Sequence, residues 1–326
     1  MTKFFKLFTV FFLLSLLSFS QISKIHYIPP LTANDLQQGG GGSIPYDQHL
    51  YLSTPSTSDV TVKITILSTG QEITYTDLRN DNPKVYQLTA DNPNQEQALN
   101  GVLFVDKDGT GSNRLSSGLV IDADCPVYAS IRYNAGAQAG ALVSKGDASL
   151  GTHFRTGMMT NGNQSDENEF QNSTNSHNLN FISVMATQDN TTVRIDLPNA
   201  SPNLQIANYN YNGNPIVQTL NRNESMIIAA DARQPNNSGE NRFALIGALV
   251  RSIDDSGTVI VEDPTKPIVV NVGSASGTFM STEGGHDHGV DQIVGLDRVG
   301  HEYIFVKGNG AGGDLETPLI IGAVDG

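Results

Sequence analysis

Apolar and polar residues alternate with a period of two along much of the chain. Residues 60–66 read Val-Thr-Val-Lys-Ile-Thr-Ile, and residues 128–133 and 193–197 follow a similar alternation. A half-buried antiparallel strand has this pattern, because successive side chains point to opposite faces of the sheet. No segment shows a convincing run of apolar residues at helical spacing. The chain is therefore predicted to be all-β.

Strand-like segments recur in the same order in a second part of the chain. Asn-Pro leads into a strand-like segment at residues 82–88 and again at residues 214–220, and further pairs of segments keep the same order. An ordered series of matches indicates a duplicated unit. We predict tandem antiparallel β-sandwich-like repeats at residues 43–179 and 180–318, each with about seven to nine strands. A β-propeller in which each unit supplies two blades is the alternative.

The two ends of the chain predict export and a longer parent protein. Two lysines precede an apolar run at residues 7–17, and small residues follow at a cleavage position, so residues 1–20 are predicted to be a signal peptide. Residues 21–42 are predicted to be an N-terminal segment with a Gly-rich linker. Residues 319–326 are strand-like, and we expect them to be the truncated start of a third repeat.

Composition narrows the range of partners. The formal net charge is −14, and −16 without the predicted signal peptide. Nucleic acid is excluded as a partner, because phosphate binding needs clustered lysine and arginine. The mature chain lacks the ~20 consecutive apolar residues of a membrane helix, so no transmembrane segment is predicted. The single cysteine, Cys125, excludes an intramolecular disulfide, and we predict that it is buried between strands.

Residues 106–113 resemble a calcium-binding loop, because oxygen-bearing side chains alternate and Gly111 stands at the sixth position. The bidentate acid expected at the twelfth position is replaced by Ser117. Calcium is the candidate cofactor, and an ordinary acidic hairpin turn is the favoured alternative. The candidate ligands are Asp106, Asp108, Thr110 and Ser112.

Residues 284–291 hold the densest polar cluster of the sequence. Two histidines separated by one residue would lie on one side of a strand, and an aspartate follows them. Zinc needs three or four converging ligands, so a Gly-rich turn with solvated histidines is the favoured interpretation. The candidate metal ligands are His286, His288 and Asp291.

Several segments resemble known surface proteins. Residues 27–30, 47–55, 127–136 and 138–146 resemble the opening of large adhesin-like proteins of gliding bacteria that use type IX secretion. Residues 186–193, 291–294 and 300–304 are similar to the N-terminal domain of IgG Fc-binding proteins. The resemblance covers most of the mature chain and implies a surface location. It implies no catalytic residues, because the shared motifs mark strands and turns.

We predict a non-catalytic secreted or cell-surface protein, namely an adhesin-like binding or structural module at the N-terminus of a larger protein. No nucleophile elbow, phosphate-binding glycine loop or zinc-protease helix occurs in the sequence, so no enzyme is expected. The expected ligand is an extracellular protein or polysaccharide. The alternative is an extracellular hydrolase or carbohydrate-binding component, because acids are scattered through the turns.

Overall fold

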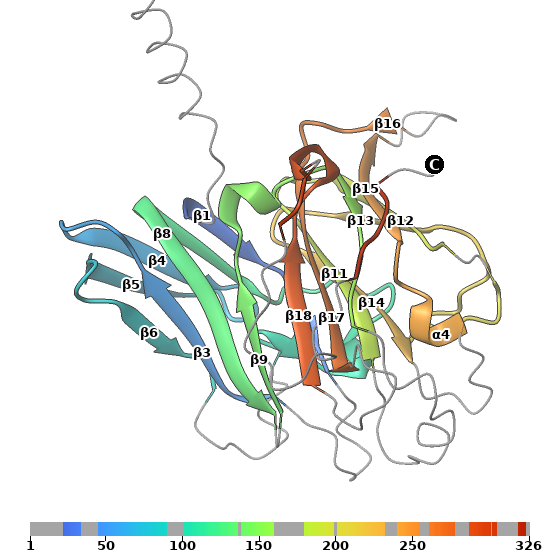
Figure 1. Cartoon of the computed structure of the whole chain (residues 1–326), viewed down its shortest axis with the longest axis horizontal. Coiled ribbons are helices and arrows are strands. Elements are labelled where there is room, and N and C mark those ends of the chain that lie inside the picture. The colour runs from blue at the N-terminus through green and yellow to red at the C-terminus, as the bar shows by residue number, and fades with distance from the viewer. Residues whose placement is uncertain are drawn as a thin grey trace, which may run out of the picture.

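The computed structural model of the chain consists mainly of β-strands (Figure 1). The predicted all-β class is confirmed: the only α-helix in the part of the chain that the structure describes, α4 (Glu240–Phe243), is a single turn. No helix in that part is long and apolar enough to cross a membrane. The described residues are 22–33, 45–89, 101–135, 138–159, 179–198, 201–231, 240–254, 261–277, 287–300, 302–304 and 319–323.

One long strand, β8 (Leu119–Ala135), organises the first sandwich. Its N-terminal half lies in a first half-sheet and its C-terminal half in a second, as the long green strand in Figure 1 shows. The first half-sheet has the order β5 (Gln71–Leu78), β4 (Val60–Ile66), β8 and β1 (Ser23–Ile28). The second half-sheet has the order β6 (Lys84–Gln87), β3 (Tyr46–Ser53), β8 and β9 (Gln138–Val143).

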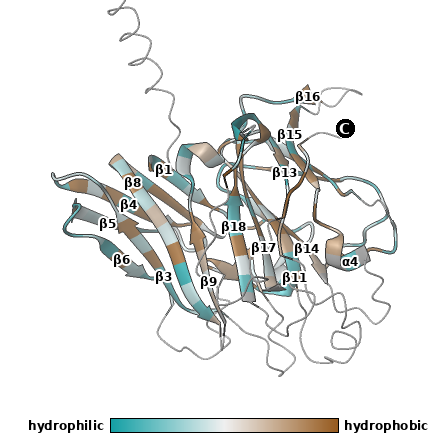
Figure 2. Ribbon diagram, viewed as in Figure 1, coloured by the Kyte–Doolittle hydropathy of each residue, from teal (hydrophilic) through white to brown (hydrophobic). Residues whose placement is uncertain are grey.

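The alternating pattern accounts for the core of the first sandwich. Val62 and Ile64 of β4 and Leu50 and Leu52 of β3 are buried in one apolar cluster. The residues between them on each strand are more exposed, and β3 and β8 therefore carry alternating teal and brown bands in Figure 2. Burial of such aliphatic side chains stabilises a sheet by about 1.5–3 kcal/mol each.

Cys125 departs from this alternation. The prediction that it is buried is wrong, because its side chain is exposed. Residues 124–126 are exposed together where β8 passes from the first half-sheet to the second. The alternation resumes at Val127, which is fully buried.

The second sandwich consists of two further antiparallel sheets. The inner sheet has the order β14 (Ser225–Asp231), β11 (Leu179–Ala186), β17 (Ile268–Gly277) and β18 (Asp287–Ile293). The outer sheet has the order β13 (Ile216–Leu220), β12 (Thr191–Asp196), β15 (Leu249–Asp254) and β10 (His153–Arg155), and β16 (Val261–Glu262) pairs with β15. The two sheets enclose a separate apolar core. The packing is that of sandwiches, as predicted, and not that of propeller blades.

The inner sheet is covered on both sides. Ile182 and Val184 of β11 belong to the core of the second sandwich, whereas Phe181 belongs to the core of the first. Met185 packs with Tyr27 in a third cluster between the sandwiches. All eight residues of β11 are buried, which explains why this segment, apart from Asn180 and Ser183, is apolar on both faces instead of alternating.

A buried hydrogen-bond network joins the two sandwiches. The amide of Gln292 accepts from Ser144 Oγ at 3.0 Å and donates to the carbonyl of Tyr27 at 2.9 Å. Asn271 donates to the carbonyl of Pro29 at 2.9 Å and accepts from Gln292 at 3.2 Å. Because buried polar groups are costly when unpaired, these bonds fix the position of one sandwich against the other.

The predicted repeat boundaries stay predictions, but the structure assigns several segments to sheets. Strand β1 of the predicted segment 21–42 pairs within the first sandwich, and β10 of the predicted repeat 43–179 pairs within the second. The predicted signal peptide and the glycines at 39–42 lie outside the described residues. The remaining short elements are β2 (Leu31–Thr32), β7 (Phe104–Val105), η3 (Lys107–Gly109), η4 (Gly146–Ser149) and η5 (Leu296–Arg298).

Candidate ligand-binding site

An open pocket of about 830 Å³ lies on the outer face of the first sandwich, which we define as the exposed side of β6, β3, β8 and β9. Leu50 and Leu52 of β3 point into the core. Because side chains alternate along a strand, His49 and Tyr51 point to the outer face. The pocket is lined by Asp47, His49, Tyr51, Arg132, Tyr133, Asn134, Ala139, Gly140, Ala141 and His288.

Arg132 and Tyr51 form the centre of the pocket. The guanidinium of Arg132 lies over the ring of Tyr51, 5.3 Å from its centroid. The ring of His49 lies 6.3 Å from that of Tyr51, and His49 is directly opposite Arg132 in the sheet register. A cation over a tyrosine face is stabilised by the ring quadrupole, so the ring orders the guanidinium without neutralising its charge.

Asp47 and Asn134 form a second polar position on the same strands. Asp47 has a φ of 48°, and the register of β3 with β8 shifts between Tyr46 and His49. Aspartate is one of the few residue types that adopt this left-handed conformation readily, and such irregularities re-aim side chains. As a result, the Asp47 carboxylate accepts a hydrogen bond of 3.0 Å from the Asn134 amide.

Two aromatic residues of the lining, Tyr133 and His288, are buried on the core side of β8 and support the pocket from below. Tyr133 packs edge-on against Phe104 at 4.9 Å and against His288 at 5.6 Å between ring centroids. A Cβ at Gly140 would lie 2.2 Å from the phenol oxygen of Tyr133. Glycine at this position of β9 therefore allows the strand to pass over the tyrosine ring.

Apolar side chains flank the pocket on the same face. Tyr51, Val85, Tyr128 and Val143 are all exposed, although large apolar residues of a sheet are usually buried. Tyr51 lies opposite Val85 on β6. An exposed apolar and aromatic group around a polar pocket is typical of a recognition surface.

The two candidate metal ligands that the structure describes in this cluster, His288 and Asp291, have different surroundings. His288 is buried against Tyr133 in the pocket wall, whereas Asp291 is exposed and forms an ion pair of 2.9 Å with Lys145. His286 lies outside the described residues. Among the residues that the structure describes, no group of three or more His, Cys, Asp or Glu side chains lies close enough to hold a metal ion.

The carboxylates of the candidate calcium loop have local partners. Asp106 caps η3 by accepting a hydrogen bond of 3.0 Å from the backbone of Gly109. Asp108 lies 3.5 Å from the ammonium of Lys107, and Ser112 is exposed. Calcium binding by this loop stays a prediction.

The same loop also docks on the second sandwich. The hydroxyl of Thr110 is buried and donates to the carbonyl of Lys107 at 2.6 Å. Gly111 donates its backbone N–H to Ile227 at 2.8 Å, has a φ of 84°, and a Cβ there would lie 2.3 Å from the carbonyl oxygen of Asn208. These contacts give the loop a structural role between the sandwiches.

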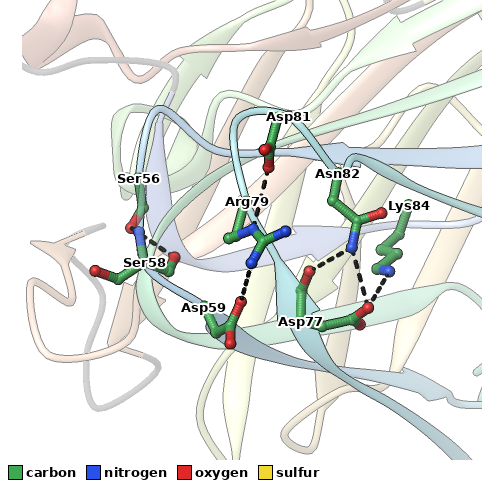
Figure 3. Close-up of polar contacts among 8 residues, drawn as sticks. All are labelled: Ser56, Ser58, Asp59, Asp77, Arg79, Asp81, Asn82 and Lys84. Carbon is green, nitrogen blue, oxygen red and sulfur yellow. Dashed lines mark hydrogen bonds and ion pairs between the residues drawn. The ribbon is translucent and has the colours of Figure 1, made fainter.

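A polar cluster marks the corner between β5 and β6, where the chain crosses from the first half-sheet to the second (Figure 3). Arg79 lies between Asp59, at 3.3 Å, and Asp81, at 3.1 Å. The hydrogen bond from Lys84 holds the pKa of Asp77 below its ordinary value. The carboxylates of these three contacts are exposed, although the Lys84 side chain is half-buried, and ion pairs at the surface contribute little to stability.

Apart from His288, the pocket residues are absent from the candidate sites that the sequence suggests. Three of the segments on which the resemblance rests, 47–55, 127–136 and 138–146, contain strands of the pocket. One signal was available. Tyr51 occupies a polar-face position of an alternating strand, and tyrosine is a residue type that is enriched at binding surfaces. Its meeting with Arg132 depends on the register of β3 with β8.

Comparison with known proteins gives one match. The sequence model of a family described as IgGFc binding protein matches residues 139–326, which is more than half of the chain. The matched region includes β9 and β18 of the pocket, whereas β3 and β8 precede it. No curated protein and no solved structure matches the chain.

Proposed function

The chain belongs to the IgGFc binding protein family, and we propose that it is a non-catalytic, adhesin-like module, secreted or displayed at the cell surface, whose outer face binds an extracellular ligand. The observation that carries this proposal is the arrangement of Arg132 over Tyr51 in an open pocket on that face. Tyrosine and arginine are the residue types that most often dominate binding energy at recognition surfaces.

The architecture supports a binding role for this face. The strands that hold His49, Tyr51 and Arg132 are fixed by a fully packed core on their other side, so the ligand would meet a rigid surface and little ordering entropy would be lost. The predicted signal peptide supports an extracellular location. Type IX secretion and a position at the start of a larger surface protein belong to the same proposal.

An array of immobilised ligands tests this function. The purified mature chain would be applied to antibody Fc fragments, extracellular-matrix proteins and glycans, and compared with Tyr51→Ala and with Phe243→Ala. Phe243 of α4 is a matched control, because it is an aromatic side chain of similar exposure, 40% against 38% for Tyr51, in the second sandwich.

We expect at least one ligand class to be retained by the wild type and by Phe243→Ala, and to bind at least about tenfold more weakly to Tyr51→Ala, which corresponds to a hot-spot residue. Equal retention by all three proteins would place the binding surface elsewhere. Turnover of an arrayed compound by the purified chain would contradict a non-catalytic role and favour the hydrolase alternative.

A further inference from the structure

Arg132 supplies the positive charge of the pocket. Among the described residues it forms no ion pair with a carboxylate, and its guanidinium rests on Tyr51. A guanidinium held by ring stacking keeps its N–H edges available, and these match two oxygens of a carboxylate or sulfate in a bidentate geometry. The arrangement therefore favours an oxyanion as ligand.

His49 adds a second nitrogen group beside Arg132. Its Nδ1 lies 2.7 Å from the carbonyl oxygen of Asp47. A carbonyl can only accept a hydrogen bond, so Nδ1 carries the proton and the ring orientation is fixed. Because His49 and Arg132 are opposite each other on neighbouring strands, the ring of His49 forms a fixed side of the pocket next to Arg132.

The other end of the pocket offers acceptors. Asn134 is two residues from Arg132 on β8, which corresponds to about 7 Å along the strand. Asn134 and Asp47 are bonded to each other at 3.0 Å, and their amide and carboxylate oxygens can accept from hydroxyl groups. The pocket thus places a cation and a hydroxyl-binding pair about one sugar ring apart.

We propose that this pocket binds an acidic oligosaccharide, with a carboxylate or sulfate of the sugar on Arg132 and its hydroxyl groups on Asp47 and Asn134. This inference rests on the proposed function, since it names the ligand of the same face. The volume of about 830 Å³ lies in the range of small-ligand sites. The polar side chains of the lining, with Arg132 at one end and Asp47 and Asn134 at the other, suit a ligand that carries both a charge and hydroxyl groups.

The acidity of the whole chain does not oppose this assignment. The net charge is −14, but exposed charges more than about 8 Å from the ligand are largely screened at physiological ionic strength. Within the pocket, Arg132 lies at one end and the Asp47 carboxylate, which is bonded to Asn134, lies at the other, so an oxyanion is favoured at the Arg132 end. A short oligosaccharide, which meets few of the distant carboxylates, suits the site better than a long polyanion.

Calorimetry of the full mature chain tests the proposal with three probes: an oligogalacturonate, a sulfated oligosaccharide and a neutral galacto-oligosaccharide of equal length. We expect the neutral probe to bind at least about tenfold more weakly than the better acidic probe, because it lacks the charged group. The two acidic probes distinguish a carboxylate site from a sulfate site.

Arg132→Gln is the matched variant, with Arg79→Gln as the control arginine on the same sandwich. We expect Arg132→Gln to weaken acidic binding at least about tenfold, Arg132→Lys to weaken it less, and Arg79→Gln to leave it unchanged. Because the Arg132 side chain is exposed, Arg132→Gln should unfold at the same temperature as the wild type. This measurement shows that weaker binding by the variant does not come from misfolding.

Two results would overturn the proposal. Equal binding of neutral and acidic probes, or wild-type affinity in Arg132→Gln, would show that no oxyanion is recognised. A third result separates the two proposals. If no oligosaccharide binds, but an arrayed protein binds the wild type and no longer binds Tyr51→Ala, the acidic oligosaccharide is excluded and the proposed function stands. If no ligand of any class depends on the outer face, both proposals fail.

Discussion

Two polar sheet surfaces of this molecule differ in what their polar residues contact. Between the sandwiches, Gln292 and Asn271 are fully buried, and their amides are bonded to protein groups. On the outer face, Arg132 and Tyr51 are exposed and contact each other. Both surfaces follow the same alternation of side chains, but only one of them is covered.

The difference shows how burial decides the role of a polar residue. A buried amide must find partners in the protein, because an unpaired one costs about 1–3 kcal/mol, and it therefore specifies how two sheets dock. An exposed guanidinium is satisfied by water and can exchange that water for a ligand. The sharpest tests of this contrast change one surface while the other serves as the reference.

The largest effect is expected for Phe181→Ala. The ring is fully buried on the side of β11 that faces the first sandwich, and its loss should lower the free energy of unfolding by about 3–5 kcal/mol through lost burial and a cavity. Urea unfolding followed by far-ultraviolet circular dichroism measures this change. A loss below about 1 kcal/mol would mean that the two sandwiches do not stabilise each other.

Gln292→Ala should have the next largest effect. It removes an acceptor from Ser144 and from the backbone of Lys145, and a donor to Tyr27. We expect a loss of about 2–4 kcal/mol in the same unfolding experiment, because several buried groups become unpaired together. The neighbouring Asp291→Ala is the control: it breaks an exposed ion pair with Lys145, and it should cost at most about 1 kcal/mol.

A smaller effect should appear as a pH dependence of stability. Burial lowers the pKa of His26, and hydrogen bonds to the carbonyls of Val127 and Ser23, together with the charge of Asp147, only partly oppose this. The unfolded chain therefore binds this proton at a higher pH than the folded chain does. Its contribution is complete above about pH 6.5, the ordinary value, and is lost as the pH falls toward the lowered pKa.

Unfolding free energies measured from pH 7.5 to pH 5 check this dependence. A single such group contributes a slope of at most about 1.4 kcal/mol per pH unit. In His26→Gln, the slope of the unfolding free energy against pH should be smaller than in the wild type, because the contribution of His26 is removed. His49→Gln on the outer face is the reference variant. Identical slopes in the wild type and in His26→Gln would contradict the assignment.

No measurable effect is expected for Arg79→Ala. Its ion pairs with Asp59 and Asp81 at the corner of β5 and β6 are exposed to solvent (Figure 3). Water replaces such contacts with little change in free energy, so the urea midpoint should match that of the wild type. A decrease similar to that of Gln292→Ala would show that this corner holds the two half-sheets together.

The strands were predictable where the alternation of side chains is regular, as in residues 60–66, which form β4, and in residues 193–197, which overlap β12 (Thr191–Asp196). The all-β class follows from that pattern. The membership of β8 in two half-sheets was not predictable, because it depends on long-range pairing with β1, β3, β4 and β9. The exposure of Cys125 follows from the same crossing.

The binding pocket was less predictable than the fold. Each of its strands shows a normal pattern, and no residue type marks a known chemical motif. Its geometry arises from a register that places His49 opposite Arg132 and from a left-handed residue at Asp47, and both are decided by tertiary packing. The metal candidates at Asp106 and His288 stay predictions, and the structure gives each residue other contacts.

The pairing of β8 also sets an order in which the protein can be assembled during translation. Every strand that pairs with β8 lies between residues 23 and 143, so the hydrogen-bonded framework of the first sandwich is complete once that stretch has left the ribosome. The inner sheet of the second sandwich is synthesised later, and its face with Phe181 needs the first sandwich as a surface to cover it. Domains generally fold in the order of synthesis, and here the earlier unit is the template for the later one.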